Sequence, residues 1–454
     1  MNDNNRPNVV YILTDQWRAK ATGYNGDPNA ITPNIDRLAA ESIDFANAIG
    51  TSPVCTPARA VLLTGRYPTT TGMFMNDIPL SPDEESIGKV FRKNGGYDTA
   101  YVGKWHVDGH GRASYIPPER RQGFDYWKVL ECTHDYQNSE YYDGDDPEIK
   151  VWPGYDAFAQ TDDACRYIKE HTESPFFLVL SLGPPHFPHH NAPEEYQAMI
   201  SPESVTFSPN VEFEDAEVEA HTRKEAAGYY SHIAALDRCV GDVVETLKSS
   251  GLEENTILVF ASDHGEMMGS HNRSPYTKQI FWDESCRVPF LLRYPPLTAT
   301  RENRKVMTPL GTVDIMPTLL SLCGLDIPEP VEGTDLSACA REGIEVEGCA
   351  ALYMSVAPFA RHNYRDPAYR AVRTARHTYV RTIDGDFYLF DDVEDPYQLN
   401  NLANDPNAAA LRENLARELA RQLENIDDPF REKEYYLEKW GYKVNDTGEV
   451  GYTR

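Results

Sequence analysis

The chain has 454 residues, enough for two unequal lobes, and its 41% hydrophobic and 11% aromatic content excludes a disordered, collagen-like or coiled-coil protein. Asp and Glu (71) outnumber Lys and Arg (43), and the resulting net charge of -28 repels phosphate backbones, which argues against a nucleic-acid partner. No apolar run approaches the ~20 residues of a membrane span and residues 1–7 are polar, so we expect no membrane partner and a cytoplasmic protein, or an exported one if a leader has been trimmed.

The first predicted element is a strand over residues 8–13, an unbroken apolar and β-branched run that ends at Thr14, Asp15 and Gln16. Thr32 and Pro33 then predict the start of a helix. The alternation continues with strands near 97–103, 176–182, 256–262 and 288–293 and helices near 84–94, 156–171, 215–249 and 312–323. Repeated strand–helix units predict an α/β fold with a mostly parallel, mixed central sheet flanked by helices. In such sheets ligands bind beyond the carboxyl ends of the strands.

The composition changes after Pro330, where short strands are predicted at 350–356, 369–382 and 386–391. A helix follows, with leucines every four residues at Leu411, Leu415, Leu419 and Leu423. We therefore expect two domains, an α/β domain at 1–339 and a smaller antiparallel α+β subdomain at 340–454. The aromatic residues near the end of the chain are expected to pack on a lobe rather than to bind a partner; they are Phe430, Tyr435, Tyr436, Trp440 and Tyr442.

The eight cysteines are scattered without a C-x-x-C pair, so most are expected to be buried thiols. Cys55 differs, because it lies at a predicted helix N-terminus with Arg59 one turn further on, in the segment CTPARAVLLTGR. The positive end of the helix dipole and the guanidinium both favour an anion there. If only the C-x-P-x-R motif is considered, an alternative to an anionic or anion-binding centre is a buried cysteine that caps the helix and has no chemical role.

This segment resembles the sulfatase-family signature C-x-P-x-R followed by A-x-L-L-x-G-R. The second family signature, G-Y-x-x-x-x-x-G-K-x-H, is matched by residues 96–106. Further matches in family order are Asp15, His186, Asp263, His264 and Lys278. The chain thus resembles the type I formylglycine-dependent sulfatases of the alkaline phosphatase superfamily, in particular bacterial carbohydrate and aryl sulfatases, over nearly its whole length. The resemblance implies an alkaline-phosphatase-like fold, with residues 1–339 as the catalytic domain.

The resemblance also implies that a formylglycine-generating maturation enzyme converts Cys55 to Cα-formylglycine. The hydrated aldehyde would carry two geminal hydroxyls. One attacks sulfur, and deprotonation of the other, after the alcohol has left, collapses the centre to the aldehyde and expels sulfate. Sulfate-ester hydrolysis further needs cations around the sulfate oxygens and an acid for the departing alcohol.

The metal ligands implied by the resemblance are Asp15, Gln16, residue 55, Asp263 and His264. Many sulfatases have Asp-Asp where this chain has Asp15-Gln16, and Asp-Asn or Asp-Gln where it has Asp263-His264. The loss of one carboxylate lowers the charge of the site and an imidazole softens it. We expect one divalent metal, Ca²⁺ first, with Mn²⁺ as the rival.

The remaining catalytic residues are assigned by the same resemblance. Lys104 and Lys278 are expected to contact sulfate oxygens, and Arg59 to hold the hydrated aldehyde. His106 would deprotonate the hydrate and His186 would protonate the leaving alcohol, although the two roles are interchangeable on this basis. Three other histidines are expected at the surface: His189, His190 and His271.

Polar residues in the loops after these strands are candidates for binding substrate, namely Asn76, His110, Arg112, His134 and Asp135. Their polarity suits a sugar better than an aromatic or sterol leaving group. We therefore expect a sulfuric ester hydrolase that cleaves sulfate monoesters of a sulfated small molecule or saccharide; nothing in the sequence specifies an oligomeric state.

Two alternatives remain. One is a phosphonate monoester or phosphodiester hydrolase of the same superfamily, which resembles this chain in its Asp-Gln and Asp-His pairs but usually lacks the pair formed by Lys104 and His106. The other is a non-catalytic metal-binding protein that kept the fold, against which the intact Cys55, Arg59 and Lys278 argue.

Overall fold

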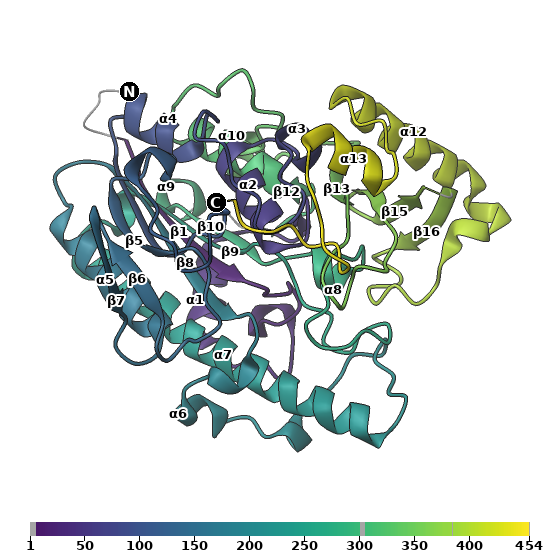
Figure 1. Ribbon diagram of the computed structural model, residues 1–454, viewed down its shortest axis with the longest axis horizontal. Coiled ribbons are helices and arrows are strands. Elements are labelled where there is room, and N and C mark those ends of the chain that lie inside the picture. Colours follow the sequence, from purple (N-terminus) through teal and green to yellow (C-terminus); the bar gives the residue numbers. More distant parts are fainter. Residues whose placement is uncertain (1–5, 300–304, 384, 454) are drawn as a thin grey trace.

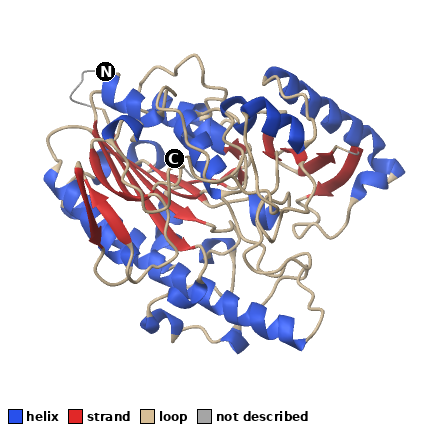
Figure 2. Ribbon diagram, viewed as in Figure 1, coloured by secondary structure: helices blue, strands red, loops and turns tan. Residues whose placement is uncertain are grey.

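The computed structural model describes residues 6–299, 305–383 and 385–453, and the first five residues of the predicted polar N-terminal segment lie outside that part of the chain. The strands form a large mixed sheet, a two-stranded pair and a small antiparallel sheet (Figure 1, Figure 2). The strands are β1 Asn8–Asp15, β2 Ile43–Phe45, β3 Ala48–Ile49, β4 Asp98–Lys104, β5 Tyr126–Leu130, β6 Glu140–Asp143, β7 Asp146–Val151, β8 Phe176–Pro185, β9 Thr256–Ser262, β10 Phe290–Arg293, β11 Lys305–Val306, β12 Leu310–Gly311, β13 Ala351–Ser355, β14 Tyr369–Arg373, β15 His377–Thr382 and β16 Gly385–Asp391.

Helices connect most of these strands. The α-helices are α1 Pro33–Glu41, α2 Cys55–Thr64, α3 Pro68–Thr71, α4 Ile87–Lys93, α5 Asp156–Glu170, α6 Glu194–Gln197, α7 Ala216–Ser249, α8 Asp283–Cys286, α9 Pro295–Thr298, α10 Thr312–Leu322, α11 Ser337–Glu342, α12 Ala409–Asn425 and α13 Lys433–Trp440. Short 3-10 turns lie at Gly23–Asn25, Pro118–Arg120, His189–Asn191, Pro202–Ser204, Glu253–Asn255, Leu402–Asn404 and Pro406–Ala408. None of the helices in the described ranges is both long enough and apolar enough to cross a bilayer.

The large sheet has the strand order β11-β2-β10-β9-β1-β8-β4-β5-β6-β7. Its centre, from β9 to β5, is parallel, whereas the pairs β9–β10, β5–β6 and β6–β7 are antiparallel. The predicted α/β fold with a mostly parallel, mixed sheet is confirmed. The edge strands were not predicted, because they are short or polar; β7 is largely exposed and has no apolar alternation.

Both faces of the large sheet are covered, which explains the unbroken apolar run of β1. Val9, Tyr11 and Leu13 face one apolar cluster, and Val10 and Ile12 face another, as the period of two in a strand requires. The first cluster includes α2, α4 and α10, and the second includes α1, α5 and α7 (Figure 1).

The C-terminal part forms the predicted small α+β unit. Strands β13 to β16 pair in sequence order, all antiparallel, and the predicted segment 369–382 is the hairpin of β14 and β15. Leu415, Leu419 and Leu423 of α12 are buried in the cluster that also contains β1 and α10. The apolar core is therefore continuous across the predicted domain boundary at 339/340, and that boundary stays a prediction.

The aromatic residues near the end of the chain pack against the large lobe. Tyr436 is buried, with its ring centroid 6.1 Å from that of Phe74, and Tyr442 lies 5.6 Å from the same ring. A Cβ atom added to Gly72 would lie 2.6 Å from the indole of Trp440, so only glycine permits this contact. The expected packing on a lobe is confirmed for Phe430, Tyr436, Trp440 and Tyr442, whereas Tyr435 is exposed.

Candidate active site

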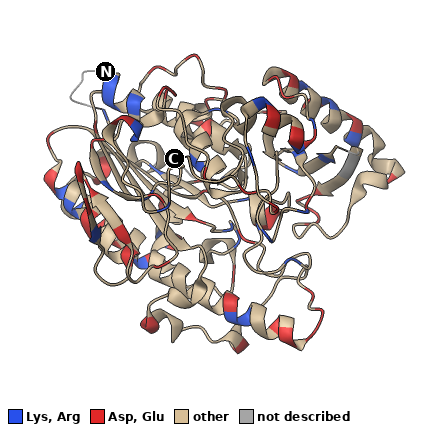
Figure 3. Cartoon of the chain, viewed as in Figure 1, with Lys and Arg blue, Asp and Glu red and all other residues tan. Residues whose placement is uncertain are grey.

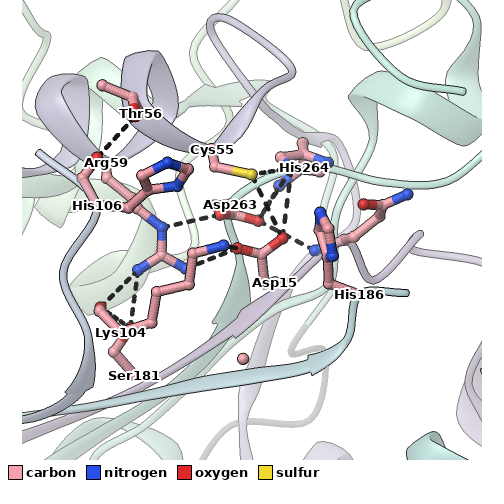
Figure 4. A network of polar contacts seen from close by, with 12 residues as sticks. Asp15, Cys55, Thr56, Arg59, Lys104, His106, Ser181, His186, Asp263 and His264 are labelled. Carbon is pink, nitrogen blue, oxygen red and sulfur yellow. Dashed lines mark hydrogen bonds and ion pairs between the residues drawn. The ribbon is translucent and has the colours of Figure 1, made fainter. Parts of the chain in front are cut away.

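Five of the expected site residues lie at the carboxyl ends of neighbouring parallel strands. Asp15 ends β1, Lys104 ends β4, His186 follows β8, and Asp263 and His264 follow β9. The carboxyl ends of parallel strands share one edge of the sheet, so these side chains converge. The first residue of α2, Cys55, lies at the same point (Figure 4).

The convergence creates a buried cluster of side chains whose types commonly bind metal ions. Ligand atoms of Asp15, Cys55, Asp263 and His264 all lie within 4.8 Å of one another. Burial and the charge of Asp15 raise the pKa of Asp263. Burial would also raise the pKa of Asp15, but the charges of Lys104 and Arg59 hold it well below its usual range. Because two buried carboxylates meet at one point and one of them is disfavoured as an anion, the cluster fits a divalent cation.

Hydrogen bonds to neighbouring residues orient the side chains in and beside the cluster. Nδ1 of His264 lies 2.9 Å from the carbonyl oxygen of Gly265, so a proton on Nδ1 leaves the Nε2 lone pair facing the cluster, 3.3 Å from the Cys55 sulfur. The amide of Gln16 donates to Glu266, a buried carboxylate that the sequence reasoning missed. Gln16 Oε1 accepts from Lys278 at 2.9 Å.

All three guanidinium nitrogens of Arg59 have partners in the site. Nε donates to Asp263 at 3.1 Å and Nη2 to Asp15 at 3.0 Å, while Nη1 donates to the carbonyl of Lys104 and to Ser181. Close approach of β4 to β8 permits these bonds, because a Cβ on Gly103 would lie 2.1 Å from the Ser181 carbonyl oxygen. Arg59 thus fixes both carboxylates of the cluster.

Cys55 lies in a strongly electropositive environment. Its sulfur is 3.5 Å from Lys278 Nζ, and its side chain is buried. Burial alone would raise the pKa of the thiol, but Lys104, Lys278 and His264 lower it well below its ordinary value. The surroundings of residue 55 therefore stabilise negative charge, which is what the binding of an anionic ester requires.

The two expected proton carriers differ in their surroundings. His186 accepts from Lys278 Nζ at Nε2, 2.8 Å away, and burial together with Lys278 lowers its pKa to about 3. Burial opposes protonation of His106, whereas Cys132, the Asp77 carboxylate and Cys55 favour it and raise its pKa to about 10. His186 is therefore neutral beside a lysine, and His106 carries a proton.

Several residues around the site have left-handed backbone conformations that are uncommon for non-glycine residues. They are Gln16 at φ 66°, His106 at φ 58°, Asp77 at φ 65°, Tyr276 at φ 79° and Gln279 at φ 65°. Such conformations cost of the order of 1 kcal/mol each and persist where the surroundings dictate them. Here they turn the chain just after a strand end or beside the cavity described next.

A cavity of about 180 Å³ opens over Cys55. Three of the five residues expected to bind substrate line it: Asn76, Arg112 and His134. Asn76 also accepts from the Thr56 backbone at 3.0 Å, at the start of α2. His110 lies outside the lining beside Asp108, and Asp135 is exposed and accepts from two backbone N–H groups of its own turn.

The sequence reasoning missed much of the cavity wall. Phe187 and Tyr276 lie close in sequence to the expected catalytic residues His186 and Lys278. This proximity is the only feature of the sequence that points to them. Five lining residues come from the C-terminal part, where no motif pointed to the site: Phe359, Ala360, His362, Asn363 and Glu449. Segments far apart in the sequence therefore build this wall.

Two of the three histidines expected at the surface are instead largely buried. His189 is buried and its Nδ1 lies 2.9 Å from Glu225 Oε2. His271 stacks on Trp282 with ring centroids 3.7 Å apart. Only His190 is exposed. The expectation failed because aromatic and carboxylate partners from other segments cover the two rings.

Comparisons with known proteins agree with this geometry. Residues 7–325 match the family model described as Sulfatase, and residues 270–425 match the one described as N-sulphoglucosamine sulphohydrolase, C-terminal. The chain is 48% identical over 439 residues to an ulvan-active sulfatase of Formosa agariphila, covering 96% of this chain and 85% of that protein.

Solved structures show the same fold. A structure from work on the metabolism of multiple glycosaminoglycans by Bacteroides thetaiotaomicron has a TM-score of 0.82 and 32% identity, with 96% of this chain and 98% of that chain covered. A phosphonate monoester hydrolase of Agrobacterium radiobacter has a TM-score of 0.73 at 23% identity, with 99% and 100% covered, which shows a shared fold alone. The family match over most of the chain and the 48% identity show that the chain belongs to the sulfatase family, the sulfuric ester hydrolases of the alkaline phosphatase superfamily.

Proposed function

We propose that this sulfatase cleaves sulfate monoesters of a saccharide at a single centre built around residue 55. The observation that carries the proposal is the position of the Cys55 sulfur, which lies among metal-type ligands on one side and 3.5 Å from Lys278 on the other. Sulfatase-family membership implies that a cysteine is matured to formylglycine and that a divalent metal is bound. Cys55 is the residue that we assign to maturation, by a formylglycine-generating enzyme.

We assign the metal ligands as Asp15, Gln16, Asp263, His264 and matured residue 55. The carboxylate and amide oxygens favour Ca²⁺, and the imidazole of His264 leaves Mn²⁺ as the competitor. The bound cation would neutralise the buried carboxylates and stabilise charge at residue 55. Arg59 keeps these ligands in place, because its Nε donates to Asp263 and its Nη2 donates to Asp15.

Two lysines and two histidines act on the ester. Lys104 and Lys278 contact the sulfate oxygens, and their hydrogen bonds to Asp15 and Gln16 hold both ammonium groups at the cluster. The matured residue 55 supplies the nucleophilic hydroxyl and the second hydroxyl needed to release sulfate. The Lys278–His186 pair supplies the proton to the departing sugar oxygen, and His106 takes up the proton of the second hydroxyl once its own has passed to solvent or to Asp77, 3.3 Å from Nε2.

The substrate class is supported by the relatives and by the cavity. The Formosa agariphila relative is an ulvan-active sulfatase, and the Bacteroides structure comes from work on glycosaminoglycans. In this chain the cavity wall carries hydrogen-bonding groups from Asn76, His134 and Asn363. Such groups suit the hydroxyls of a sugar.

The alternative of a phosphonate monoester or phosphodiester hydrolase has weaker support. The phosphonate monoester hydrolase shares the fold at 23% identity, whereas the ulvan-active sulfatase is 48% identical to this chain. Lys104 and Lys278 also both approach residue 55, where a diester would place a second organic group. In a sulfate monoester, the three oxygens outside the ester link carry no second organic group, so the lysines can contact them.

A direct test combines mass and turnover. The tryptic peptide that contains Cys55 should show formylglycine, which has an oxygen in place of sulfur and two fewer hydrogens, in protein produced with a maturation enzyme. The same protein should hydrolyse an aryl sulfate and sulfated oligosaccharides. Fully matured protein that hydrolyses an aryl phosphodiester faster than the matched sulfate would refute the proposal.

A further inference from the structure

A segment close to the end of the chain forms part of the cavity wall. Residues 442–453 run from α13 back across the large lobe, which Figure 1 shows as the yellow trace leading to the point marked C. The carbonyl of Thr447 accepts from Ala360 N at 2.9 Å, and the N–H of Thr453 donates to Gly109 O at 2.8 Å. Glu449 lines the cavity. Both family models end at or before residue 425, so this wall is a feature that the family pattern does not describe.

The same segment fixes the position of Arg112. The Nε of Arg112 donates to the hydroxyl of Tyr452 at 2.8 Å, across 340 residues of sequence. Arg112 is exposed and lines the cavity that contains Cys55. In the described parts of the chain, no hydrogen-bond partner occupies its two terminal amino groups. A guanidinium held by Nε presents these two groups as a planar fork, which matches a carboxylate or a sulfate.

The charges around the cavity favour an anion at this fork despite the net charge of -28. His134 lines the cavity, and burial together with the positive charges of Lys104 and Arg112 lowers its pKa to about 2. Two acidic groups of the cavity lining interrupt this field. Asp77 lies 3.3 Å from Nε2 of His106, and Glu449 accepts from Thr447 through Oε2 at 2.6 Å. An anionic substituent is therefore repelled near Glu449 and attracted towards Arg112.

We propose that Arg112, positioned by Tyr452, binds a second anionic group of the saccharide while the sulfate to be cleaved lies against Lys104 and Lys278. The group is a sugar carboxylate or a further sulfate, since both present oxygens in the geometry of the fork. The inference rests on the proposed function, because it requires a sulfated saccharide. Arg112 contacts the substrate, and Tyr452 is a positioning residue.

The test uses three saccharides that share the sulfate ester to be cleaved. The first carries a free carboxylate on the neighbouring sugar, the second carries the methyl ester of that carboxylate, and the third carries a further sulfate in its place. Wild-type protein should prefer one or both anionic saccharides over the methyl ester by about tenfold to a hundredfold in kcat/KM, the range expected for a bidentate charged contact. The saccharide with the larger preference identifies the anion.

Three full-length variants separate contact from position. Arg112→Met should abolish the preference for an anionic saccharide over the methyl ester. Arg112→Lys should retain only part of this preference, because the planar fork is lost. Tyr452→Phe keeps the ring but removes the acceptor, and it should reduce the preference mainly through a higher KM, with kcat changed less than about threefold. Asp446→Asn, an exposed change in the same segment, is the matched control and should behave as wild type.

The outcomes separate this inference from the proposed function. The inference is wrong if all three saccharides are cleaved with equal efficiency, or if the preference survives in Arg112→Met. Hydrolysis of an aryl sulfate without cleavage of any saccharide would instead contradict the proposed function, and the inference with it. If the saccharides identify a carboxylate, free glucuronate offers a check that needs no saccharide cleavage: it should inhibit aryl sulfate turnover by wild type at least tenfold more strongly than it inhibits Arg112→Met.

Discussion

At the scale of single residues, Cys55 combines burial with a cationic environment. It is the first residue of α2 and 1% exposed, and its sulfur faces Lys278 and His264. An ordinary buried thiol is inert, and Cys239, packed against Ala157 at 3.6 Å, is such a residue in this chain. The difference between the two sites lies in the neighbouring charges.

We expect Cys55→Ala to lose sulfatase turnover to the assay background while the free energy of unfolding changes by about 1 kcal/mol, because one small buried atom is removed. Cys239→Ala is the matched control and should keep full activity. Turnover of an aryl sulfate and urea unfolding check both. A fully active Cys55→Ala variant would contradict the assigned nucleophile.

Replacement by serine tests the need for two hydroxyls. Cys55→Ser can attack sulfur but has no second hydroxyl with which to expel sulfate, so it should accumulate a covalent sulfate ester under substrate. Intact-protein mass spectrometry detects the adduct. If serine stays unmodified after prolonged incubation with substrate, release does not depend on the second hydroxyl in the way proposed.

Lys104 tests the discrimination between sulfate and phosphate. Its ammonium lies 2.7 Å from Asp15 Oδ2, at the edge of the cluster. We expect Lys104→Ala to lower kcat/KM for an aryl sulfate by about 10²–10³-fold, the usual loss for one charged oxyanion contact, and to affect a matched phosphodiester less. The ratio of the two kcat/KM values is the measurement. An unchanged ratio would mean that Lys104 does not contact the sulfate oxygens.

At the scale of elements, a buried ion pair fixes the chain between α12 and α13 onto the small sheet. Arg370 of β14 donates to Asp428 at 2.5 Å, and both side chains are fully buried. Tyr436 of α13 also donates to Asp428. This part of the chain leads directly to the segment 442–453 that lines the cavity, so the pair supports the cavity wall.

We expect Asp428→Asn to lower the free energy of unfolding by about 3 kcal/mol at pH 7, because it leaves a buried guanidinium without its counter-charge. Burial would raise the pKa of Asp428, but Arg370 and Tyr436 lower it. For a lowered acid pKa the stabilisation is present above the unfolded pKa of about 4 and is lost as the pH falls below it.

The difference in the free energy of unfolding between wild type and Asp428→Asn should therefore become smaller as the pH falls from 7 towards 4 and below. Urea unfolding at a series of pH values measures it. Asp427→Asn is the matched control: Asp427 is exposed and has a φ of 52°, which Asn tolerates. A gap that stays constant down to the lowest measurable pH would show that the charge of Asp428 is not the source of the stabilisation.

At the scale of the whole molecule, the cluster joins parts of the chain that are far apart. Asp15, Cys55 and Asp263 belong to β1, α2 and the loop after β9. Acidic residues are spread over most elements (Figure 3), so the cations at the cluster work against the charge of the molecule as a whole.

Removal of the metal should therefore affect both activity and stability. Chelation followed by dialysis should abolish turnover and lower Tm, since a metal at 100 to 1,000 times its Kd contributes about 3–4 kcal/mol. Added Ca²⁺ should restore both. Differential scanning calorimetry with and without Ca²⁺ measures the shift, and Asp263→Ala, which lacks a ligand, should show little of it. Full activity and unchanged Tm after verified metal removal would contradict the assigned site.

The sequence by itself determined the central strands of the large sheet and the residues at their carboxyl ends. Buried strands are continuous apolar runs, and a polar residue at the end of such a run, as with Asp15, Lys104 and Asp263, must lie at the edge where ligands bind. These features depend on neighbours within a few residues, so they are visible in a linear pattern. The resemblance to sulfatases added roles to residues that the pattern had already placed.

Only the tertiary structure decided what surrounds these residues. The partners of Arg59, the burial of His189 and the contact between Arg112 and Tyr452 join residues whose separation in sequence reaches 340 positions. Single side-chain contacts of this kind leave no periodic pattern in the sequence. A polar loop residue also looks the same in the sequence whether it is exposed, as Asp135 is, or lines the cavity, as His134 does. The physical reason is that these positions follow from the packing of whole segments against one another, not from local preference.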